Sequence, residues 1–230
     1  RLEADNLETA ELDRALTVTY SEFFRDPLAF AVLEEVVLPD LAQRAEAGGR
    51  RELRVWSAGC AGGEEACSVA ILLHDLRAVR DSLVSFRIFA TDASADELDR
   101  ARRGVYGRAA VRKVRLEHME AHFTPVADAW AVDVHLRNCV DYSRYDLLDE
   151  RSTSPAPSIF GDFDLVLCCN LLFYYRRETR EFIVAKVRQS LAPGGYLVTG
   201  TAEQAIVEHS GGFVTMTPPA AVYRKTGGRT

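Results

Sequence analysis

Short apolar runs alternate with longer segments of helical periodicity through most of the chain. Apolar side chains dominate residues 53–56, 86–90 and 163–168, each of a length typical of a β-strand. The third run is nearly continuous, as in strands that are buried on both faces of a parallel sheet. Residues 64–76 instead place apolar side chains at i, i+3, i+4 and i+7, the spacing of a helix. This alternation predicts an α/β fold built on a largely parallel sheet.

The remaining pattern predicts how that sheet is flanked. Pro27 suits the first turn of a helix, so we interpret residues 1–50 as an N-terminal helical segment and 51–230 as the main domain. Residues 105–138 lose the strand–helix alternation, and residues 130–136 alternate apolar and polar side chains like a half-buried strand. We therefore expect a Rossmann-like, seven-stranded, mostly parallel sheet with an antiparallel last strand and a small β-subdomain insertion at about 105–138.

The turn after the first strand carries the first indication of a ligand. Residues 57–63 are small, and Glu64 and Glu65 begin the helix that follows. Glycines let the backbone approach a ligand closely, and a helix N-terminus offers unpaired N–H groups. The spacing does not match G-x-G-x-x-G, and the two glutamates would repel a pyrophosphate. A ligand with a cationic end, such as S-adenosylmethionine, fits better; the alternative is an ordinary tight strand–helix turn.

Asp92 follows the second strand at the position expected of a ribose-binding carboxylate. A carboxylate there can accept hydrogen bonds from both ribose hydroxyls. The alternative is that Asp92 caps the next helix. Ser94 and Glu97 have the capping-box pattern, however, so Ser94 can cap that helix and leave Asp92 to a ligand.

Composition narrows the functional classes. A net charge of −6 and a pI near 5.5 argue against nucleic acid or an anionic membrane as the main partner. No apolar run reaches the roughly 18–20 residues of a membrane span, and the first residues do not resemble a signal peptide. The five cysteines form no metal-type pair of pairs, and Cys168 and Cys169 look like core residues within a strand. We expect a cytoplasmic monomer that contains no metal site.

Several blocks, in order, resemble the chemotaxis receptor methyltransferases, the CheR family. TVTYSEFFRD resembles T-x-N-x-T-x-F-F-R, WSAGCAGGEEACSVA resembles S-A-x-x-S-T-G-E-E-P-Y-S, and ATDAS resembles A-T-D-I-S. FDLVLCCNLLFYY and LAPGGYLVTGTAE resemble F-D-V-I-F-C-R-N-V-L-I-Y-F and L-x-P-G-G-Y-L-x-L-G-x-x-E. The resemblance covers residues 17–224. It implies a class I methyltransferase fold and the cofactor S-adenosylmethionine, with S-adenosylhomocysteine as product. It also implies methylation of glutamate carboxylates on chemoreceptor cytoplasmic domains.

The resemblance also implies site residues. Arg25 and Tyr174 would lie beside the transferred methyl group as the catalytic pair. The alternative for Arg25 is a salt bridge to Glu22 or Asp26, and for Tyr174 a place in the core. The cofactor-binding residues implied are Thr19, Ser21, Arg25, Ala58, Gly59, Glu64, Asp92, Ala93, Asp146, Leu147, Asn170 and Leu171.

The chain departs from the family pattern at several of these positions. Thr19 replaces an Asn, Ser21 replaces a Thr but keeps the hydroxyl, and Asp146 replaces the Asn that meets the adenine. Cys169 replaces the Arg that precedes Asn170. Only 16 residues precede the first block, so the family's helical N-terminal domain, with its basic receptor-contacting face, is not expected here.

The expected chemistry is a displacement at the methyl carbon of a sulfonium. A glutamate side chain is ionised at neutral pH, so the reaction needs no general base, and it needs no metal. The enzyme must align the two reactants and exclude water. Two alternatives remain: a regulatory module that binds the cofactor without methyltransferase activity, and a methyltransferase that acts on a non-receptor substrate, including a small molecule.

The β-subdomain bears on receptor recognition. Some members of the resembling family grip a C-terminal receptor peptide there, with a glycine-bearing hairpin. In this chain the hairpin region contains no glycine, and Pro125 removes a backbone donor. We therefore predict that this chain does not bind such a peptide.

Overall fold

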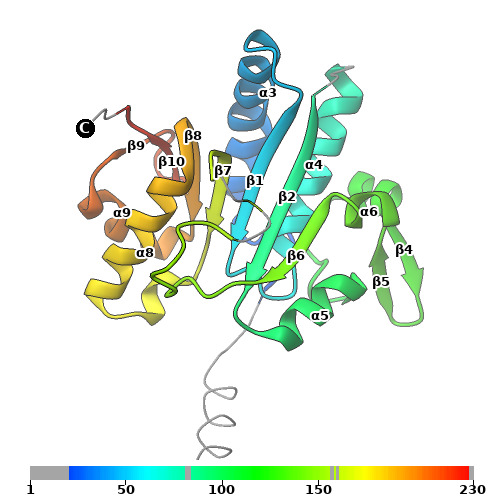
Figure 1. Cartoon of the computed structure of the whole chain (residues 1–230). Coiled ribbons are helices and arrows are strands. Elements are labelled where there is room, and N and C mark those ends of the chain that lie inside the picture. Colours follow the sequence, from blue (N-terminus) through cyan, green and yellow to red (C-terminus); the bar gives the residue numbers. More distant parts are fainter. Residues whose placement is uncertain (1–20, 81–83, 156–157, 159–160, 228–230) are drawn as a thin grey trace, which may run out of the picture.

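The computed structural model describes residues 21–80, 84–155, 158 and 161–227. A seven-stranded sheet forms the centre, with helices on both faces (Figure 1). Its strands, in spatial order, are β6 (Val140–Arg144), β2 (Ser85–Asp92), β1 (Glu52–Ala58), β7 (Phe163–Cys168), β8 (Leu191–Thr199), β10 (Val222–Lys225) and β9 (Phe213–Thr215).

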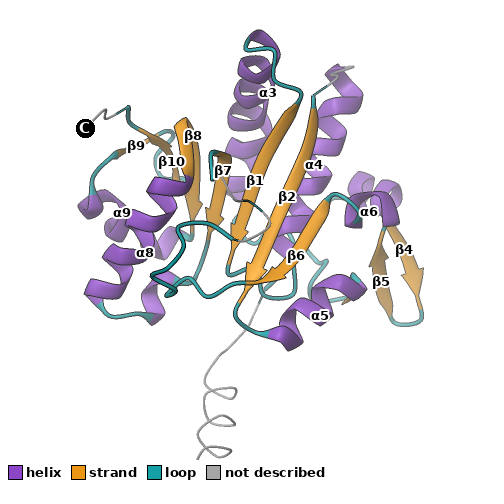
Figure 2. Ribbon diagram, in the orientation of Figure 1, coloured by secondary structure: helices purple, strands orange, loops and turns teal. Residues whose placement is uncertain are grey.

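The strand directions confirm the predicted fold class. β1 pairs in parallel with both β2 and β7, β2 pairs in parallel with β6, and β7 pairs in parallel with β8. β10, the last strand of the chain, is antiparallel to β8 and β9 and lies between them. Parallel pairing requires crossover connections: helices α4 (Glu64–Arg80) and α8 (Arg177–Ser190), labelled in Figure 2, lie in the connections from β1 to β2 and from β7 to β8.

Two apolar layers cover the sheet, because successive strand side chains point to opposite faces. Val55 belongs to the layer with α3 (Leu38–Ala47), α4 (Glu64–Arg80) and α5 (Ala95–Arg103). Trp56, the next residue, belongs to the layer with α8 (Arg177–Ser190) and α9 (Gln204–Ser210). The central strand β7 is buried along its whole length, as its apolar sequence predicts.

Before β1, three consecutive helical segments pack on the sheet: α2 (Pro27–Val32), a π-helical turn η1 (Leu33–Val37) and α3. Asp26 caps α2 by accepting a hydrogen bond from the backbone of Ala29, and Pro27 occupies the first turn as expected. No helix among the described residues has the length and apolar character needed to span a membrane.

The insertion contains a second, three-stranded sheet in the order β3 (Val105–Gly107), β5 (Ala129–Val132) and β4 (Phe123–Val126). It also contains α6 (Leu116–His122) and α7 (Val134–Arg137), so the region is less purely β than predicted. The strand expected over 130–136 ends at Val132, because the Asp133 side chain accepts from the backbone N–H of His135 and caps α7.

The hairpin between β4 and β5 closes without glycine. Val126 and Ala129 are paired, and Ala127 takes the positive φ, +50°, that a tight turn requires. β4 is an outer strand of the small sheet, and Pro125 within it has no N–H to donate.

Candidate functional site

The carboxyl ends of β1, β2, β6 and β7 meet at one edge of the main sheet, where their arrowheads lie together in Figure 1. Parallel α/β sheets bind ligands at this edge. Asp92 is the last residue of β2, and Gly59, Asp146 and Asn170 lie just beyond β1, β6 and β7. The topology therefore brings together four segments that lie far apart in the sequence.

The turn after β1 is held tightly against the end of β2. The backbone N–H groups of Gly59 and Cys60 both donate to the carbonyl of Thr91, over 2.8 and 2.9 Å. Gly59 has φ +73°, and a Cβ there would lie 3.1 Å from Leu171 Cδ2. Gly63 has φ +86°, and a Cβ there would lie 2.7 Å from the Tyr142 hydroxyl. Only glycine fits both positions, as the sequence pattern indicated.

Asp92 is fixed by the backbone on both sides. One carboxylate oxygen accepts from the N–H of Ala61 and the other from the N–H of Ser94, each over 2.9 Å. Ser94 itself caps α5, as predicted, by accepting from the N–H of Glu97. A carboxylate offers about four acceptor sites, so two hydrogen bonds leave capacity for two ribose hydroxyls. The geometry therefore fits Asp92 as a pre-positioned ribose acceptor.

Glu64 begins α4 and is only 2% exposed. Its Oε1 lies 3.2 Å from Arg100 Nη2 on α5. Burial raises the pKa of this carboxyl, while Arg100 and the Ser21 hydroxyl act in the opposite direction. A Cβ at Gly62 would clash with the Arg100 guanidinium, so this glycine lets Arg100 reach Glu64. Ser21 and Glu64, both expected cofactor contacts, are therefore neighbours.

Glu65 faces a different group of side chains. Burial raises the pKa of Glu65 to about 7, while the Cys169 thiol and Arg25 lower it. Arg25, Glu65 and Cys169 therefore lie together at the sheet edge. The prediction that Cys169 lies within the strand is wrong, because β7 ends at Cys168, although Cys169 is partly buried against the core.

The backbone around Arg25 is anchored by two other elements. The N–H of Phe24 donates to Ser68 Oγ on α4 over 3.1 Å, and Phe24 has φ +51°. The carbonyl of Arg25 accepts from Lys113 Nζ, in the insertion, over 2.7 Å. Glu22 pairs with the same Lys113 over 2.6 Å. The block that carries Arg25 is thus held between α4 and the insertion.

The loop after β7 is shaped by a buried carboxylate from elsewhere. Glu203 is fully buried and accepts from the N–H groups of Asn170, Leu172 and Gly200 over 2.6–2.8 Å. Asn170 adopts φ +56°, and a Cβ at Gly200 would lie 2.4 Å from the side-chain nitrogen Nδ2 of Asn170. Sequence reasoning did not assign a role to Glu203, although its position at the end of the LAPGGYLVTGTAE block was a usable signal.

The two tyrosines after this loop lie in different surroundings. Tyr174 ends a 3-10 turn, η2 (Leu172–Tyr174), and is 58% exposed, so the alternative of a core position is wrong. Its ring centroid lies 4.3 Å from that of Phe173. Tyr175 is half-buried, and burial together with Asp146, Cys168 and Asp92 raises its pKa. Tyr175 is therefore close to the Asp92 side of the edge.

The remaining predicted residues flank these groups. Asp146 is exposed after β6, and its side chain accepts from the N–H of Leu148 over 2.8 Å. Leu147 and Ala58 are buried, and the carbonyl of Ala93 accepts from Arg144. Thr19 lies outside the described residues.

The carboxyl groups gathered at this edge fit S-adenosylmethionine. Glu64, Glu65, Asp92 and Asp146 are all carboxyl groups, and an ammonium and a sulfonium are the ligand charges that such a set favours. A phosphate would be repelled by the same groups.

A second cluster lies away from this edge and was not predicted. The sequence indicated no metal site, yet the ligand atoms of His74, Asp75 and His122 lie within 4.8 Å of one another. The sequence pattern could not predict this cluster, because Asp75 and His122 are 47 residues apart.

A family profile and individual relatives in the comparison with known proteins agree with one another. A sequence profile of the CheR methyltransferase SAM-binding domain matches residues 19–221. Chemotaxis protein methyltransferase 1 of Pseudomonas aeruginosa is 32% identical over 193 residues, which are 82% of this chain and 67% of that protein. Probable biofilm formation methyltransferase WspC of the same organism is 32% identical over 227 residues, which are 98% of this chain and 51% of that protein.

A third relative is longer still. An uncharacterized 104.1 kDa protein of Rhodobacter capsulatus is 32% identical over 202 residues, which are 88% of this chain and 20% of that protein. The chain thus spans between 20% and 67% of the length of these three relatives.

Proposed function

The chain belongs to the CheR methyltransferase family, whose SAM-binding domain it carries, and we propose that it methylates glutamate side chains of a chemoreceptor cytoplasmic domain. The observation that carries this proposal is the edge formed by Gly59, Asp92 and Asn170, with Glu64, Glu65 and Arg25 beside it. A cationic cofactor and an anionic acceptor can both be held there.

S-adenosylmethionine, when bound, supplies a methyl group activated by a sulfonium. Asp92 would hold the ribose hydroxyls, and Asp146 with Leu147 would border the adenine. Glu64 and Ser21 would hold the polar end of the ligand, since a buried carboxylate suits an ammonium group. The other proposed contacts are Thr19, Arg25, Ala58, Gly59, Ala93, Asn170 and Leu171.

The chain's own residues then position the acceptor carboxylate. Arg25 offers a planar guanidinium that can hold a carboxylate through two parallel hydrogen bonds. The substrate glutamate is already ionised at neutral pH, so no proton has to be removed before it attacks the methyl carbon. The opposite charges of carboxylate and sulfonium cancel during the reaction, which favours transfer in a site that excludes water.

Tyr174 and Phe173 lie at the exposed rim of this edge. A protein substrate that delivers a glutamate to Arg25 would cover them. Burial of the two rings would exclude water from the methyl group and leave the Tyr174 hydroxyl to orient the donor. This arrangement fits a carboxylate carried on a protein surface.

Transfer of labelled methyl from S-adenosylmethionine to chemoreceptor cytoplasmic fragments tests the proposal. We expect base-labile methyl esters on receptor glutamates with the wild type and strongly reduced labelling with Arg25→Ala. Cofactor binding without transfer to any of the receptor fragments would favour the regulatory module instead. Labelling of a different acceptor would support the methyltransferase activity but contradict the receptor substrate.

A further inference from the structure

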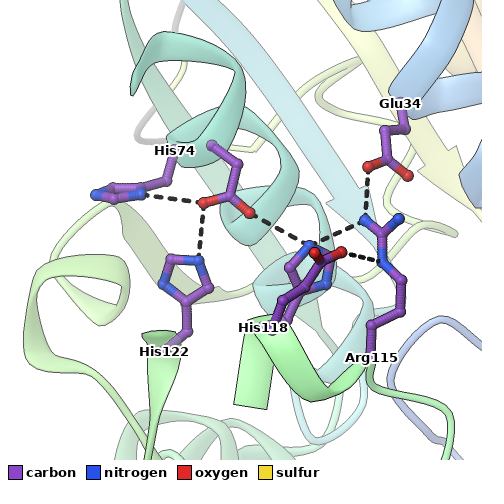
Figure 3. Close-up of polar contacts among 7 residues, drawn as sticks. Glu34, His74, Arg115, His118 and His122 are labelled. Carbon is purple, nitrogen blue, oxygen red and sulfur yellow. Dashed lines mark hydrogen bonds and ion pairs between the residues drawn. The ribbon is translucent and has the colours of Figure 1, made fainter. Parts of the chain in front are cut away.

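Three histidines surround the carboxylate of Asp75, where α4 meets α6 (Figure 3). His74 and Asp75 belong to α4, and His118 and His122 belong to α6, four residues apart on one helical face. Asp75 Oδ1 lies 2.9 Å from His122 Nε2 and 3.5 Å from His74 Nδ1, and Asp75 Oδ2 lies 3.3 Å from His118 Nε2.

The Nε2 atom of His118 already has a hydrogen-bond partner outside the cluster. Its Nε2 lies 2.9 Å from Arg115 Nη2, and a guanidinium can only donate, so this nitrogen acts as the acceptor. Arg115 in turn contacts Glu34 on η1 and Glu117 on α6. Figure 3 shows Arg115 and Glu34 beside His118, with His74 and His122 away from them. His118 is therefore engaged by Arg115, and the other two imidazoles are the candidate ligands.

The ligand atoms of the remaining three groups lie within 4.8 Å of one another, close enough for one metal ion to draw them together. Zinc binds imidazole nitrogen and carboxylate oxygen at about 2.0–2.2 Å, which places neighbouring ligand atoms about 3.3–3.5 Å apart around a tetrahedral ion. Of the two separations that involve Asp75 Oδ1, the 3.5 Å to His74 lies in this range, and the 2.9 Å to His122 is shorter, as in a hydrogen bond that the metal would replace. The rings of His74 and His122 are nearly perpendicular, at 84°, with centroids 5.2 Å apart. Aiming all three ligand atoms at one ion requires side-chain rotations, for which the half-exposed His74 has room.

We propose that His74, Asp75 and His122 bind a divalent transition-metal ion, with zinc as the first choice and water in the fourth position. Two imidazoles and one carboxylate are a ligand set that zinc accepts, and they are less suited to magnesium or calcium, which prefer oxygen. His122 is 5% exposed and fixed, whereas the side chain of His74 is 49% exposed and leaves the ion a path of entry.

The ion has a structural role at this position. His122 is the last residue of α6 and leads directly into β4, so the metal ties the insertion to α4. Glu65, at the start of α4, is about ten residues from the ligands, or roughly 15 Å along the helix axis. The metal is therefore outside the methyl-transfer site and takes no part in that reaction. The inference does not depend on the proposed function.

Zinc binding to the chelator-stripped full chain tests the site. We expect one zinc ion per chain in competition with a chromophoric chelator, and a zinc-dependent rise in Tm. His74→Ala and Asp75→Asn should each weaken zinc binding at least tenfold and reduce the Tm rise accordingly. The matched control, His209→Ala on the exposed face of α9, should behave like the wild type. Because His74 is half-exposed, its removal leaves the fold intact.

Cobalt substitution identifies the ligands. The expected spectrum is that of a four-coordinate Co²⁺ ion with nitrogen and oxygen ligands, lost in His74→Ala and kept in His209→Ala. A thiolate charge-transfer band would place the ion on cysteine and overturn the proposal. Equal zinc affinity in the wild type and in both ligand variants would overturn it, and so would the absence of binding at micromolar zinc.

Discussion

The turn after β1 and the loop after β7 meet at the same edge of the sheet but are built in different ways. The turn after β1 takes its shape from its own residues: Gly59 and Gly63 adopt positive φ, and Glu64 and Glu65 follow directly. The loop after β7 has no glycine, and Asn170 is held at φ +56° by the hydrogen bond that its N–H donates to Glu203.

The carboxyl groups of Glu203, which holds the loop after β7, and of Glu65, which follows the turn after β1, have different roles. Glu203 accepts three backbone hydrogen bonds that close the second loop, so its contribution is to the fold. Glu65 faces Arg25 and Cys169, and burial raises its pKa to about 7. A group of that kind costs stability when it is charged, so its contribution to the fold differs from that of Glu203.

Removal of Glu203 should give the largest effect on stability. Glu203→Ala leaves three backbone N–H groups at Asn170, Leu172 and Gly200 without their acceptor, each worth about 1–3 kcal/mol when buried. We expect the free energy of unfolding to fall by roughly 3 kcal/mol or more. Urea unfolding measures it, with the exposed Glu208→Ala on α9 as the control. Equal losses in the two variants would contradict the role of Glu203.

Replacing Glu65 should raise the free energy of unfolding, whereas replacing Glu203 lowers it. Between pH 4.5 and about 7 the folded Glu65 keeps a proton that the unfolded chain has lost, so stability from this group falls as the pH rises. The variant Glu65→Gln has no charge to bury. Above pH 7 its free energy of unfolding should therefore exceed that of the wild type by up to about 3 kcal/mol. The difference should vanish near pH 4.5.

Unfolding of both proteins at pH 5 and pH 8 checks the Glu65 prediction. Glu64 and Glu203 also have raised pKa values, but both remain in wild type and variant, so the difference isolates Glu65. A constant difference at the two pH values would show that Glu65 is not the titrating group.

The same contrast explains what the sequence could predict. The glycines and glutamates of the first turn are contiguous, so the pattern revealed the turn, its helix and the carboxylate-rich character of the site. Glu203 acts on a residue 33 positions away, and His122 meets Asp75 across 47 positions. Such contacts depend on the tertiary fold.

The predicted β-subdomain is confirmed, but periodicity did not give the detail of its backbone. Alternation over 130–136 gave a strand, but the Asp133 cap ended it at Val132. The hairpin formed despite the lack of glycine, because pairing along β4 and β5 holds Ala127 at positive φ. In both cases a local hydrogen bond or strand pairing decided the backbone, and periodicity could not resolve it.

Arg25 should affect turnover more than cofactor affinity, because it is proposed to hold the acceptor carboxylate. Arg25→Ala should lower kcat roughly 10- to 100-fold, the equivalent of a lost charged hydrogen bond. Arg25→Lys should restore only part of it, since a point charge does not reproduce the planar fork. Tyr174→Phe should give a smaller loss. Methyl transfer and cofactor affinity measured on the same samples separate the two effects; parallel loss of both would assign Arg25 to cofactor binding alone.

The smallest expected effect concerns the outer strand β4. Pro125 supplies no N–H to a peptide added along this strand, so we expect no saturable binding of a labelled C-terminal receptor pentapeptide. Fluorescence anisotropy up to high micromolar protein measures it. Saturable micromolar binding would overturn the prediction.

Calorimetric titration of S-adenosylmethionine and S-adenosylhomocysteine into wild type and Asp92→Ala tests the central claim most directly. Asp92 is the carboxylate that the backbone of Ala61 and Ser94 holds at the sheet edge. Loss of its two ribose hydrogen bonds should weaken binding of both ligands by roughly 2–3 kcal/mol. Ser94→Ala removes the adjacent helix cap and controls for damage to α5. Unchanged affinity in Asp92→Ala would contradict the cofactor site described above.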